Sequence, residues 1–475
     1  MVDMGGLIEV PFAGEGAGEG GLTWGQQRIW AEIQCSGGAL NMGGIMPMPP
    51  TTTIDEITRL LAFIMGRHPS LRTRLRFTPD GDPRQVVSAA GVATLEVIDV
   101  EDVDPAELVA RYAAGRFAGD LPLVLADPAR VSADEVAEGV QMRFWEPFDE
   151  ERDWPVRMAV IRVAGTITHL VVMYNHVVID GEGLGVLVAD LATMDPATGT
   201  ATAPPPGPTP LELVELQRTP AHQRRSEAAL RHWEKALRTV PARPYGGPYP
   251  PQELRFWELE YESPAAELAM HAIAARCRVD AKPVMLAVFA LAMYRLTGVH
   301  PSAAQILVNN RFRPGLSDTI SPLNQAGLCV LDVDGVPFDE IVARAARAVM
   351  NAGMYAYYDM ARHRELVAAV GRERGEQLEL TCFLNDRRTA VRPDPDRVPT
   401  PQDVRAALPQ SQLRWRRRVD RPNKGMYLHV LEKTGTCWLL LTVDTADVPP
   451  DDMVRLVREV EAVAVEAVVG ERVRG

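Results

Sequence analysis

The segment NHVVIDG, residues 175–181, holds the residue types best suited to chemistry in this chain. His176 has a side chain that exchanges protons near neutral pH, although a lone histidine on an apolar strand is more often a packed core residue than a catalyst. Asp180 and Gly181 favour the catalytic interpretation, because the aspartate can brace a loop and the glycine permits a tight turn with close substrate approach. We therefore predict that His176 is the key residue of an active site.

The elements around this segment predict where it lies. Two valine-rich, strand-like runs, 155–163 and 168–176, precede it and are typical of a buried sheet. After Gly181 the apolar period becomes helical, through Leu184, Leu187, Val188 and Leu191. NHVVIDG thus lies between the end of a buried strand and the start of a helix, where α/β folds commonly place reactive groups.

The whole chain has 475 residues, which predicts two or more domains. The Pro-rich stretch APPPGPTP, 203–210, is the best linker candidate, so we predict two α/β halves, 1–205 and 206–475. Apolar periodicity predicts further helices near 22–34, 54–66, 211–218, 226–238, 264–276, 281–297, 338–350, 360–372 and 451–468. Strands are predicted at 7–12 and 306–311, from about Leu71, and as a pair within 426–446.

Composition excludes several classes of function. The formal net charge of −13 argues against a nucleic-acid partner, which needs a basic surface. The five cysteines form no CxxC pair, so neither a disulfide framework nor a metal site is predicted. The sequence shows no signal peptide and no apolar run of ~18 residues, so we expect a cytoplasmic protein without a membrane partner.

Two further patterns are weaker. GEGAGEGG, 14–21, contains a GxGxxG match, but a dinucleotide site also needs a second strand, and residues 35–50 are rich in Gly, Met and Pro. We therefore expect a flexible loop there. NDRR, 385–388, follows a strand-like run; we expect an exposed turn, with substrate contact as the alternative.

NHVVIDG resembles the HHxxxDG motif of nonribosomal peptide synthetase condensation domains, which belong to the chloramphenicol-acetyltransferase-like superfamily. Other family motifs have counterparts here in the same order: LTWGQQRIW (22–30) is similar to LSxxQxRxW, RHPSLRT (67–73) to RHExLRT, PFDEERDWPVR (147–157) to PFDLxxxPLxR, RHWEKAL (231–237) to YWxxxL, and NNR (309–311) to a terminal NR. Ordered matches over nearly the whole chain are far more specific than any one of them.

The resemblance implies a fold and a set of roles. The fold is α/β, with two chloramphenicol-acetyltransferase-like subdomains in a V-shaped pseudo-dimer and the active site in the tunnel between them. His176 acts as a general base or positions the nucleophile, and Gly181 lines the tunnel mouth. Asp180 is largely structural and pairs with an arginine, for which Arg311 is the best candidate, because a buried carboxylate without a cation is costly. Asn175 replaces the first motif histidine; it can hydrogen-bond but does not titrate near neutral pH.

The implied function is that of a free-standing condensation enzyme of natural-product or antibiotic biosynthesis. It would transfer an acyl group from a phosphopantetheine thioester on an acyl or peptidyl carrier protein to an amine or alcohol of a small-molecule acceptor. The donor would arrive in trans, since the chain shows no GGxS carrier site and no adenylation-type phosphate loop, and no cofactor of its own is expected. Two alternatives stay open: a CoA-dependent acyltransferase of the same superfamily, and a catalytically silent recruitment or docking domain.

Overall fold

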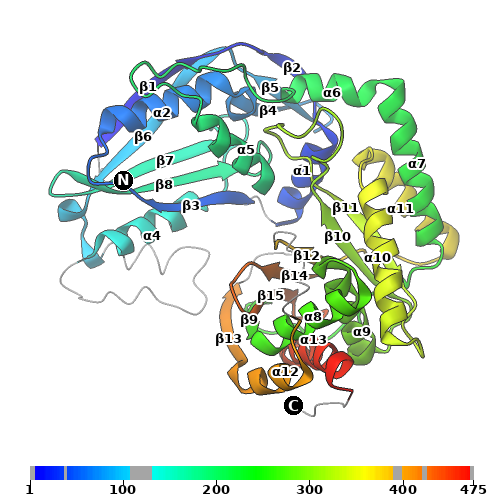
Figure 1. Cartoon of the computed structure of the whole chain (residues 1–475). Helices are drawn as coiled ribbons and strands as arrows, with labels where there is room; N and C mark the ends of the chain where they lie inside the picture. Colours follow the sequence, from blue (N-terminus) through cyan, green and yellow to red (C-terminus); the bar gives the residue numbers. More distant parts are fainter. Residues whose placement is uncertain are drawn as a thin grey trace. The chain divides into compact units, whose positions relative to one another are not determined.

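The computed structural model describes residues 6–36, 40–106, 108, 131–388, 398–419 and 425–470 (Figure 1). The chain forms two compact units. The first comprises Met1–Gln223 and Asn309–Asn324, and the second comprises Arg224–Val308 and Gln325–Gly475. The sequence placed the division near residue 205; in the structure the units change after Gln223, and the later segment Asn309–Asn324 returns to the first unit.

The first unit is built on a five-stranded sheet. Its strands, in spatial order, are β1 (Gly6–Ala13), β6 (Ala90–Asp99), β7 (Val156–Val163), β8 (Thr166–Asn175) and β3 (Asn41–Pro47). Only β6 and β7 are parallel; the other neighbours are antiparallel. The strands predicted before NHVVIDG are therefore confirmed as the hairpin β7–β8.

Helices cover both faces of this sheet. On one face lie α1 (Trp24–Ser36), α2 (Ile54–Arg67) and α5 (Gly181–Leu191), and on the other lies α4 (Ala133–Phe144) (Figure 1). Val160 and Val172 face the first layer, whereas Ile161 and Val171 face α4. Because both faces are buried, β7 and β8 are apolar at successive positions, which explains their valine-rich sequences.

Strand β3 was not expected from the sequence. Glycine has low strand propensity, and two glycines lie in this stretch. Gly43 is needed because β3 approaches β8 closely: a Cβ at this position would lie 2.0 Å from the carbonyl oxygen of Val172. A tertiary contact therefore overrides local propensity, and the expectation that residues 35–50 lack a strand is wrong.

A second, three-stranded sheet orders the glycine-rich segment. It contains β2 (Gly18–Gly21), β5 (Pro83–Val87) and β4 (Thr73–Phe77) in that order. The fully buried guanidinium of Arg72 donates to the carbonyl oxygens of Gly14, Glu15 and Ser88. Residues 18–21 thus form a strand of this sheet rather than the flexible loop expected.

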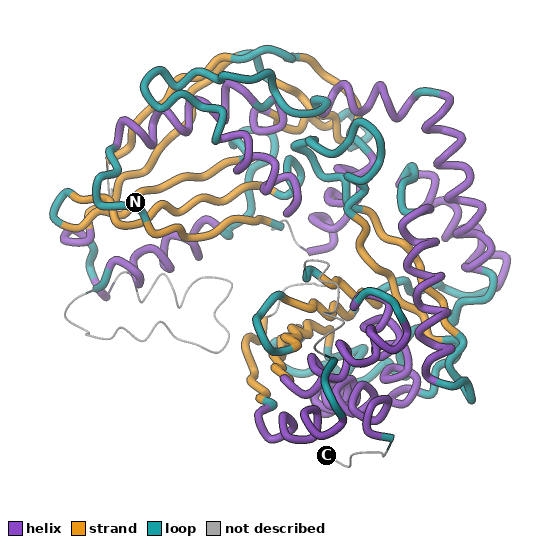
Figure 2. Tube along the Cα trace, in the orientation of Figure 1, coloured by secondary structure: helices purple, strands orange, loops and turns teal. Residues whose placement is uncertain are grey.

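The second unit is built on a seven-stranded sheet (Figure 2). Its strands, in spatial order, are β11 (Gln325–Leu331), β10 (Ser302–Val308), β12 (Cys382–Asp386), β14 (Met426–Leu431), β15 (Cys437–Asp444), β9 (Phe256–Ser263) and β13 (Gln412–Val419). The core on one face includes α8 (Pro264–Cys277), α9 (Ala281–Thr297), α10 (Phe338–Tyr355), α12 (Pro401–Ala407) and α13 (Pro450–Val469). A separate cluster joins α7 (Pro220–Leu237) and α11 (Met360–Arg374) to β11.

These elements confirm most of the predicted helices, including α6 (Pro210–Arg218) next to the Pro-rich stretch. The fold class is mixed α/β, as predicted. In the described ranges, none of the helices combines the length and apolar character needed to cross a bilayer.

A buried ion pair ties α2 to α5 in the first unit. Arg67, the last residue of α2, binds both carboxylate oxygens of Asp190 at 2.5 and 2.8 Å, and His68 Nε2 lies 3.1 Å from the same carboxylate. Burial raises the pKa of Asp190, but the hydrogen bonds from Arg67 and His68 outweigh it, so the net shift is strongly downward. The charged carboxylate therefore stabilises the folded state.

We predict that Asp190→Asn lowers the stability of the protein at neutral pH by about 3 kcal/mol, because Arg67 loses its buried counter-charge. A depressed aspartate pKa contributes stability above the unfolded value, near 3.8, that is lost as the pH falls below it. The difference from wild type should therefore shrink in acid, as measured by urea unfolding over a pH series. An equally large difference at all pH values would contradict this, and Glu215→Gln, in an exposed pair with Arg218, is the control expected to change little.

Candidate active site

Polar side chains of the NHVVIDG segment form hydrogen bonds to the backbone of the same turn. Strand β8 ends at Asn175, and α5 begins at Gly181 with Asp180 as its N-cap. The Asp180 carboxylate accepts a hydrogen bond from the Gly183 amide at 2.8 Å, and the Asn175 side-chain oxygen accepts one from the Val177 amide at 3.0 Å. Side chains at both ends of the turn thus fix its backbone, as is common at helix N-termini.

His176 is held in one tautomer. Its Nδ1 lies 2.7 Å from the carbonyl oxygen of Ile179, and its backbone amide donates to the carbonyl oxygen of Leu40 at 3.0 Å. A carbonyl oxygen is only an acceptor, so Nδ1 carries the proton in this contact. In the neutral ring, Nε2 then has an unshared pair with which to accept a proton or a hydrogen bond.

The surroundings of His176 favour the neutral ring. Burial lowers its pKa from 6.5, and the positive charge of Arg28 lowers it further. Asp180 and Glu32 act in the opposite direction but do not cancel the shift. At neutral pH the imidazole is therefore ready to act as a base.

Arg28 of α1 is a fixed cation near His176. Its guanidinium donates to the backbone and side-chain oxygens of Asn324, at 3.0 and 2.9 Å, and pairs with Glu32 one turn along the helix. The sequence matched Arg28 to a motif but assigned it no role. The Arg28 guanidinium is held in place by Asn324, which is almost three hundred residues away in the chain. No local sequence signal therefore reveals the effect of Arg28 on His176.

Arg311 lies against Asp180 inside the first unit. Its Nη2 is 2.6 Å from Asp180 Oδ1 and its Nη1 is 3.0 Å from Oδ2, and their side chains are only 8% and 1% exposed. Arg311 also donates to the carbonyl oxygens of Thr319 and Ser321, and the Leu323 amide donates to Asp180. The predicted partner Arg311 is therefore in direct contact with Asp180. Arg311 itself lies beyond the end of β10, because that strand begins and ends earlier than the predicted strand 306–311.

Gly183 is a residue of this site that the sequence did not single out. A Cβ at Gly183 would lie 2.9 Å from Arg311 Nη2 and 3.0 Å from Asp180 Oδ1, so a side chain would displace the ion pair. At Gly181, which the motif emphasises, the nearest atom would be Met42 Cε at 3.9 Å. Gly183 therefore packs against the ion pair, and Gly181 has open space around it.

The RHPSLRT segment forms a hydrogen bond to the turn that contains NHVVIDG. The Ser70 hydroxyl donates a hydrogen bond to the carbonyl oxygen of Val178, in the middle of NHVVIDG. Ser70 is 1% exposed, and it lies in a 3₁₀ turn, Pro69–Arg72, between α2 and β4. The sequence matched this motif to the family without indicating this contact.

Asn175 has a different environment from His176. It is 3% exposed, and its side chain also hydrogen-bonds the Glu150 carboxyl. Burial raises the pKa of Glu150, and the hydrogen bond from Asn175 opposes that shift. Asn175 therefore joins β8 to the PFDEERDWPVR segment, whereas His176 carries the titratable group.

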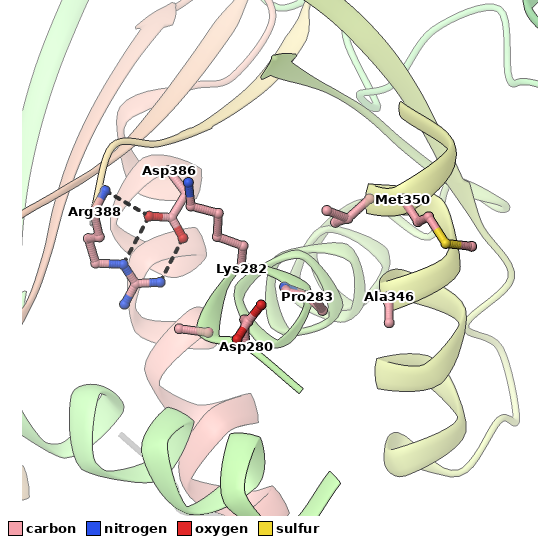
Figure 3. A pocket seen from close by; sticks show the side chains of 9 residues that line it. Asp280, Lys282, Pro283, Ala346, Met350, Asp386 and Arg388 are labelled. Carbon is pink, nitrogen blue, oxygen red and sulfur yellow. Dashed lines mark hydrogen bonds and ion pairs between the residues drawn. The ribbon is translucent and has the colours of Figure 1, made fainter. Parts of the chain in front are cut away.

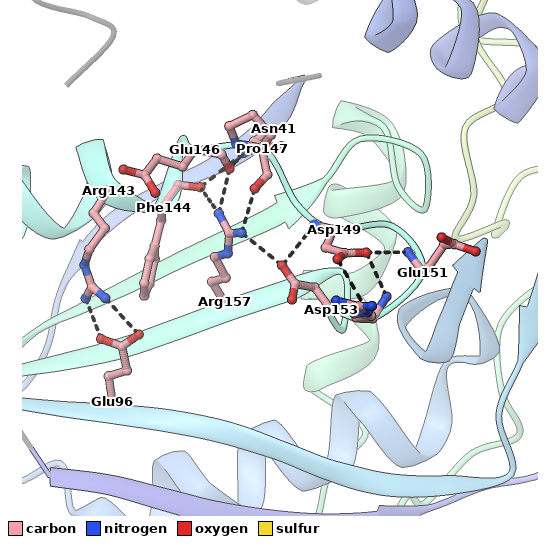
Figure 4. A network of polar contacts seen from close by, with 11 residues as sticks. Asn41, Glu96, Arg143, Phe144, Glu146, Pro147, Asp149, Glu151, Asp153 and Arg157 are labelled. Atoms are coloured by element: carbon pink, nitrogen blue, oxygen red, sulfur yellow. Dashed lines mark hydrogen bonds and ion pairs between the residues drawn. The ribbon is translucent and has the colours of Figure 1, made fainter. Parts of the chain in front are cut away.

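Arg157 organises the PFDEERDWPVR segment (Figure 4). Its guanidinium donates to the backbone oxygens of Phe144, Glu146 and Pro147 and to the Asp153 carboxylate. Asn41, which pairs with Asn175 in the sheet, donates to two of the same carbonyl oxygens. These contacts fix the chain that carries Glu150 next to the end of β8.

The NDRR segment lies in the second unit and is not simply an exposed turn. Arg388 Nε and Nη2 donate hydrogen bonds to the two carboxylate oxygens of Asp386, at 3.0 and 2.7 Å. The two side chains are only 11% and 8% exposed. Both line a pocket of about 250 Å³ together with Lys282 and Pro283 of α9 and Ala346 and Met350 of α10 (Figure 3). The expectation of a solvated turn is wrong for this pair.

Comparison with known proteins agrees with the motifs. The family model described as Condensation domain matches residues 18–374. Phosphinothricin tripeptide synthetase PhsC of Streptomyces viridochromogenes is 25% identical over 343 residues, which are 70% of this chain and 29% of that protein. The isonitrile lipopeptide synthase of Mycobacterium tuberculosis is 25% identical over 314 residues, 63% of this chain and 11% of that protein. The chain thus spans less than a third of the length of these curated relatives.

Solved structures show the same fold. SgcC5 from Streptomyces globisporus has a TM-score of 0.67 at 15% identity, over 96% of this chain and 100% of that one. The first condensation domain of the calcium-dependent antibiotic synthetase has a TM-score of 0.62 at 16% identity, over 96% of this chain and 97% of that one. The predicted fold class, that of condensation domains, is confirmed.

We predict that Asp180→Ala destabilises the protein by about 3–5 kcal/mol, because it leaves the buried Arg311 guanidinium without a counter-charge. Soluble yield and urea unfolding measure this effect. Glu182→Ala, which removes an exposed acid two residues later, is the matched control and should fold like wild type. A well-folded but inactive Asp180→Ala protein would instead show that Asp180 takes part in the chemistry.

Proposed function

Because this chain belongs to the Condensation domain family, we propose that it transfers an acyl group from a carrier-protein thioester to an amine or alcohol, with His176 as the base. The observation that carries the proposal is the contact between His176 Nδ1 and the Ile179 carbonyl oxygen, which leaves Nε2 as an acceptor. The phosphopantetheine arm belongs to the donor and is a substrate group. The similarity to synthetases of peptide natural products supports this donor class.

The proposed reaction follows from these groups. The acceptor nitrogen or oxygen attacks the thioester carbonyl carbon while its proton passes to His176 Nε2. The tetrahedral intermediate collapses, the carbon–sulfur bond breaks, and the sulfur takes the proton back from His176. An amide or ester and a free thiol result, and no oxidant or reductant is consumed.

Two effects of known size accelerate reactions of this kind. Positioning two bound reactants contributes up to ~7–11 kcal/mol in favourable cases. General base assistance contributes typically ~10²–10⁴-fold. The rigid turn around His176 serves the second effect, because a base must be held within hydrogen-bonding distance of the proton it accepts.

We predict that His176→Ala lowers condensation activity by at least ~10²-fold while the melting temperature stays near that of wild type, because the imidazole supports the reaction more than the fold. Product formation is followed by mass spectrometry. His169→Ala, on strand β8 that directly precedes His176 and paired with the exposed Asp134, is the matched control and should retain activity. Full activity of His176→Ala would refute the role of His176.

The donor class is tested in the same assay. Wild-type protein receives the same acyl group on a carrier protein, on CoA, or on N-acetylcysteamine, with a panel of amines and alcohols. The proposal predicts the highest kcat/KM with the carrier-bound donor. Preference for CoA would instead indicate a CoA-dependent acyltransferase, and no turnover with any donor would favour a recruitment domain.

The pH profile gives a further prediction. Protonation of His176 removes the base, so kcat/KM should fall as the pH drops through the pKa of that residue. Because burial and Arg28 lower this pKa, the midpoint should lie below the ordinary value of 6.5. Arg28→Gln removes the cation and should move the midpoint to higher pH. A wild-type midpoint at or above pH 6.5 would show that burial and Arg28 do not lower the pKa of His176.

A further inference from the structure

Strand β13 is an arginine-rich edge strand of the second unit. It reads QLRWRRRV, residues 412–419, and is the last strand in the order of the seven-stranded sheet, paired only with β9 among the described strands (Figure 1). Four of its eight residues are arginines and none is acidic, in a chain whose net charge is −13. The proposed chemistry at His176 does not use this strand.

The arginines gather mainly on one face of the sheet. Arg414 lies opposite Glu260 in the register, and a bulge between Trp415 and Arg417 then places Arg417 opposite Glu258. Arg416 and Arg417 lie 3.3 Å from Glu260 and Glu258, yet both arginine side chains remain 49% exposed. The two glutamate side chains are far more buried, at 6% and 13% exposure. The groups exposed to solvent are therefore the arginine guanidinium groups.

Among the described residues, the charge of this region is positive after pairing. The third glutamate of β9, Glu262, is already bound by Lys433 at 2.5 Å. The remaining two glutamates face Arg414, Arg416 and Arg417, and Arg414 makes its hydrogen bond to the neutral side chain of Gln412, at 2.7 Å. An exposed excess of cations on a strongly acidic protein attracts acidic partners at long range.

Aromatic side chains lie on the other face of this strand pair, next to Arg418: in the register Trp415 is opposite Leu259, and Arg418 is opposite Trp257. Trp415, 37% exposed, packs edge-on against Trp257 with ring centroids 5.3 Å apart. The guanidinium of Arg418 lies over the Trp257 ring at 3.9 Å. Tryptophan and arginine are the residues most enriched among those that dominate protein–protein binding energy.

We propose that β13 is the docking surface for an acidic face of a protein partner, and, resting on the proposed function, that this partner is the carrier protein that delivers the acyl donor. The exposed arginines accelerate and orient the encounter, and Trp415 supplies the apolar contact. The occupant is a protein because the strand combines a cationic row on one face, an indole on the other, and an edge that pairs with none of the described strands except β9.

The test compares two double variants of equal charge. Arg414→Gln/Arg417→Gln neutralises β13 and keeps Arg416, the partner of the more deeply buried Glu260. Arg347→Gln/Arg455→Gln, at exposed arginines of α10 and α13 in the same unit, is the matched control. Thermal melting verifies that both variants fold, and Trp415→Ala tests the apolar contact without changing any charge.

Two donors are used with each protein: an acidic acyl carrier protein loaded with acyl-phosphopantetheine, and the same acyl group on N-acetylcysteamine. For the β13 variant we expect kcat/KM with the carrier-bound donor to fall by roughly two- to tenfold, with a weaker salt dependence than wild type. Its kcat/KM with the small thioester should be unchanged, and the control variant should match wild type with both donors.

Several outcomes overturn the docking assignment. If the β13 variant has the same kcat/KM as wild type with the carrier-bound donor, the arginines do not dock the carrier. Their role would then be to protect a sheet edge against aggregation. An equal loss in the control variant would indicate a non-specific charge effect. Binding of a labelled oligonucleotide or of anionic vesicles with the same dependence on Arg414 and Arg417 would point to another partner class. Failure of the proposed function itself is distinguishable, because wild type would then turn over neither donor.

Discussion

The buried ion pair between Asp180 and Arg311 is the contact on which the geometry of NHVVIDG depends. Burying two charges is expensive, and here the cost is offset because every carboxylate oxygen of Asp180 has a partner, from Arg311, Gly183 or Leu323. The pair joins a helix N-cap to the segment Asn309–Asn324, which returns to the first unit after a long excursion of the chain. A site closed in this way forms only when that return is complete.

The state of His176 follows from the rigidity of this turn. The Ile179 carbonyl can hold Nδ1 only if the backbone between β8 and α5 stays fixed, which Asp180 ensures from one end and Asn175 from the other. Ser70 holds the middle of the turn through Val178. The nearby charges of Arg28 and Glu32 then act on a ring whose orientation is already set.

Much of this arrangement could be predicted from local sequence and family motifs. The strand–turn–helix around His176 follows from a change of apolar period, and Arg311 was singled out because a buried aspartate needs a cation. The role of Gly183 could not be predicted, since it depends on the position of an arginine over a hundred residues away. The same holds for Glu150 beside Asn175 and for β3, whose glycines disfavour a strand until β8 lies against them. Local patterns report the periodicity of an element, whereas contacts between distant segments decide what each polar side chain meets.

The most direct test of the account is the tautomer of His176 in solution. Nitrogen NMR of the protein labelled at histidine, with the His176→Gln variant used for assignment, distinguishes a protonated ring nitrogen from a bare one. The structure predicts a protonated Nδ1 and a bare Nε2 at neutral pH, persisting until the pH falls below 6.5. A protonated Nε2 at neutral pH, whether in the other tautomer or in a charged ring, would contradict the assignment of His176 as the base.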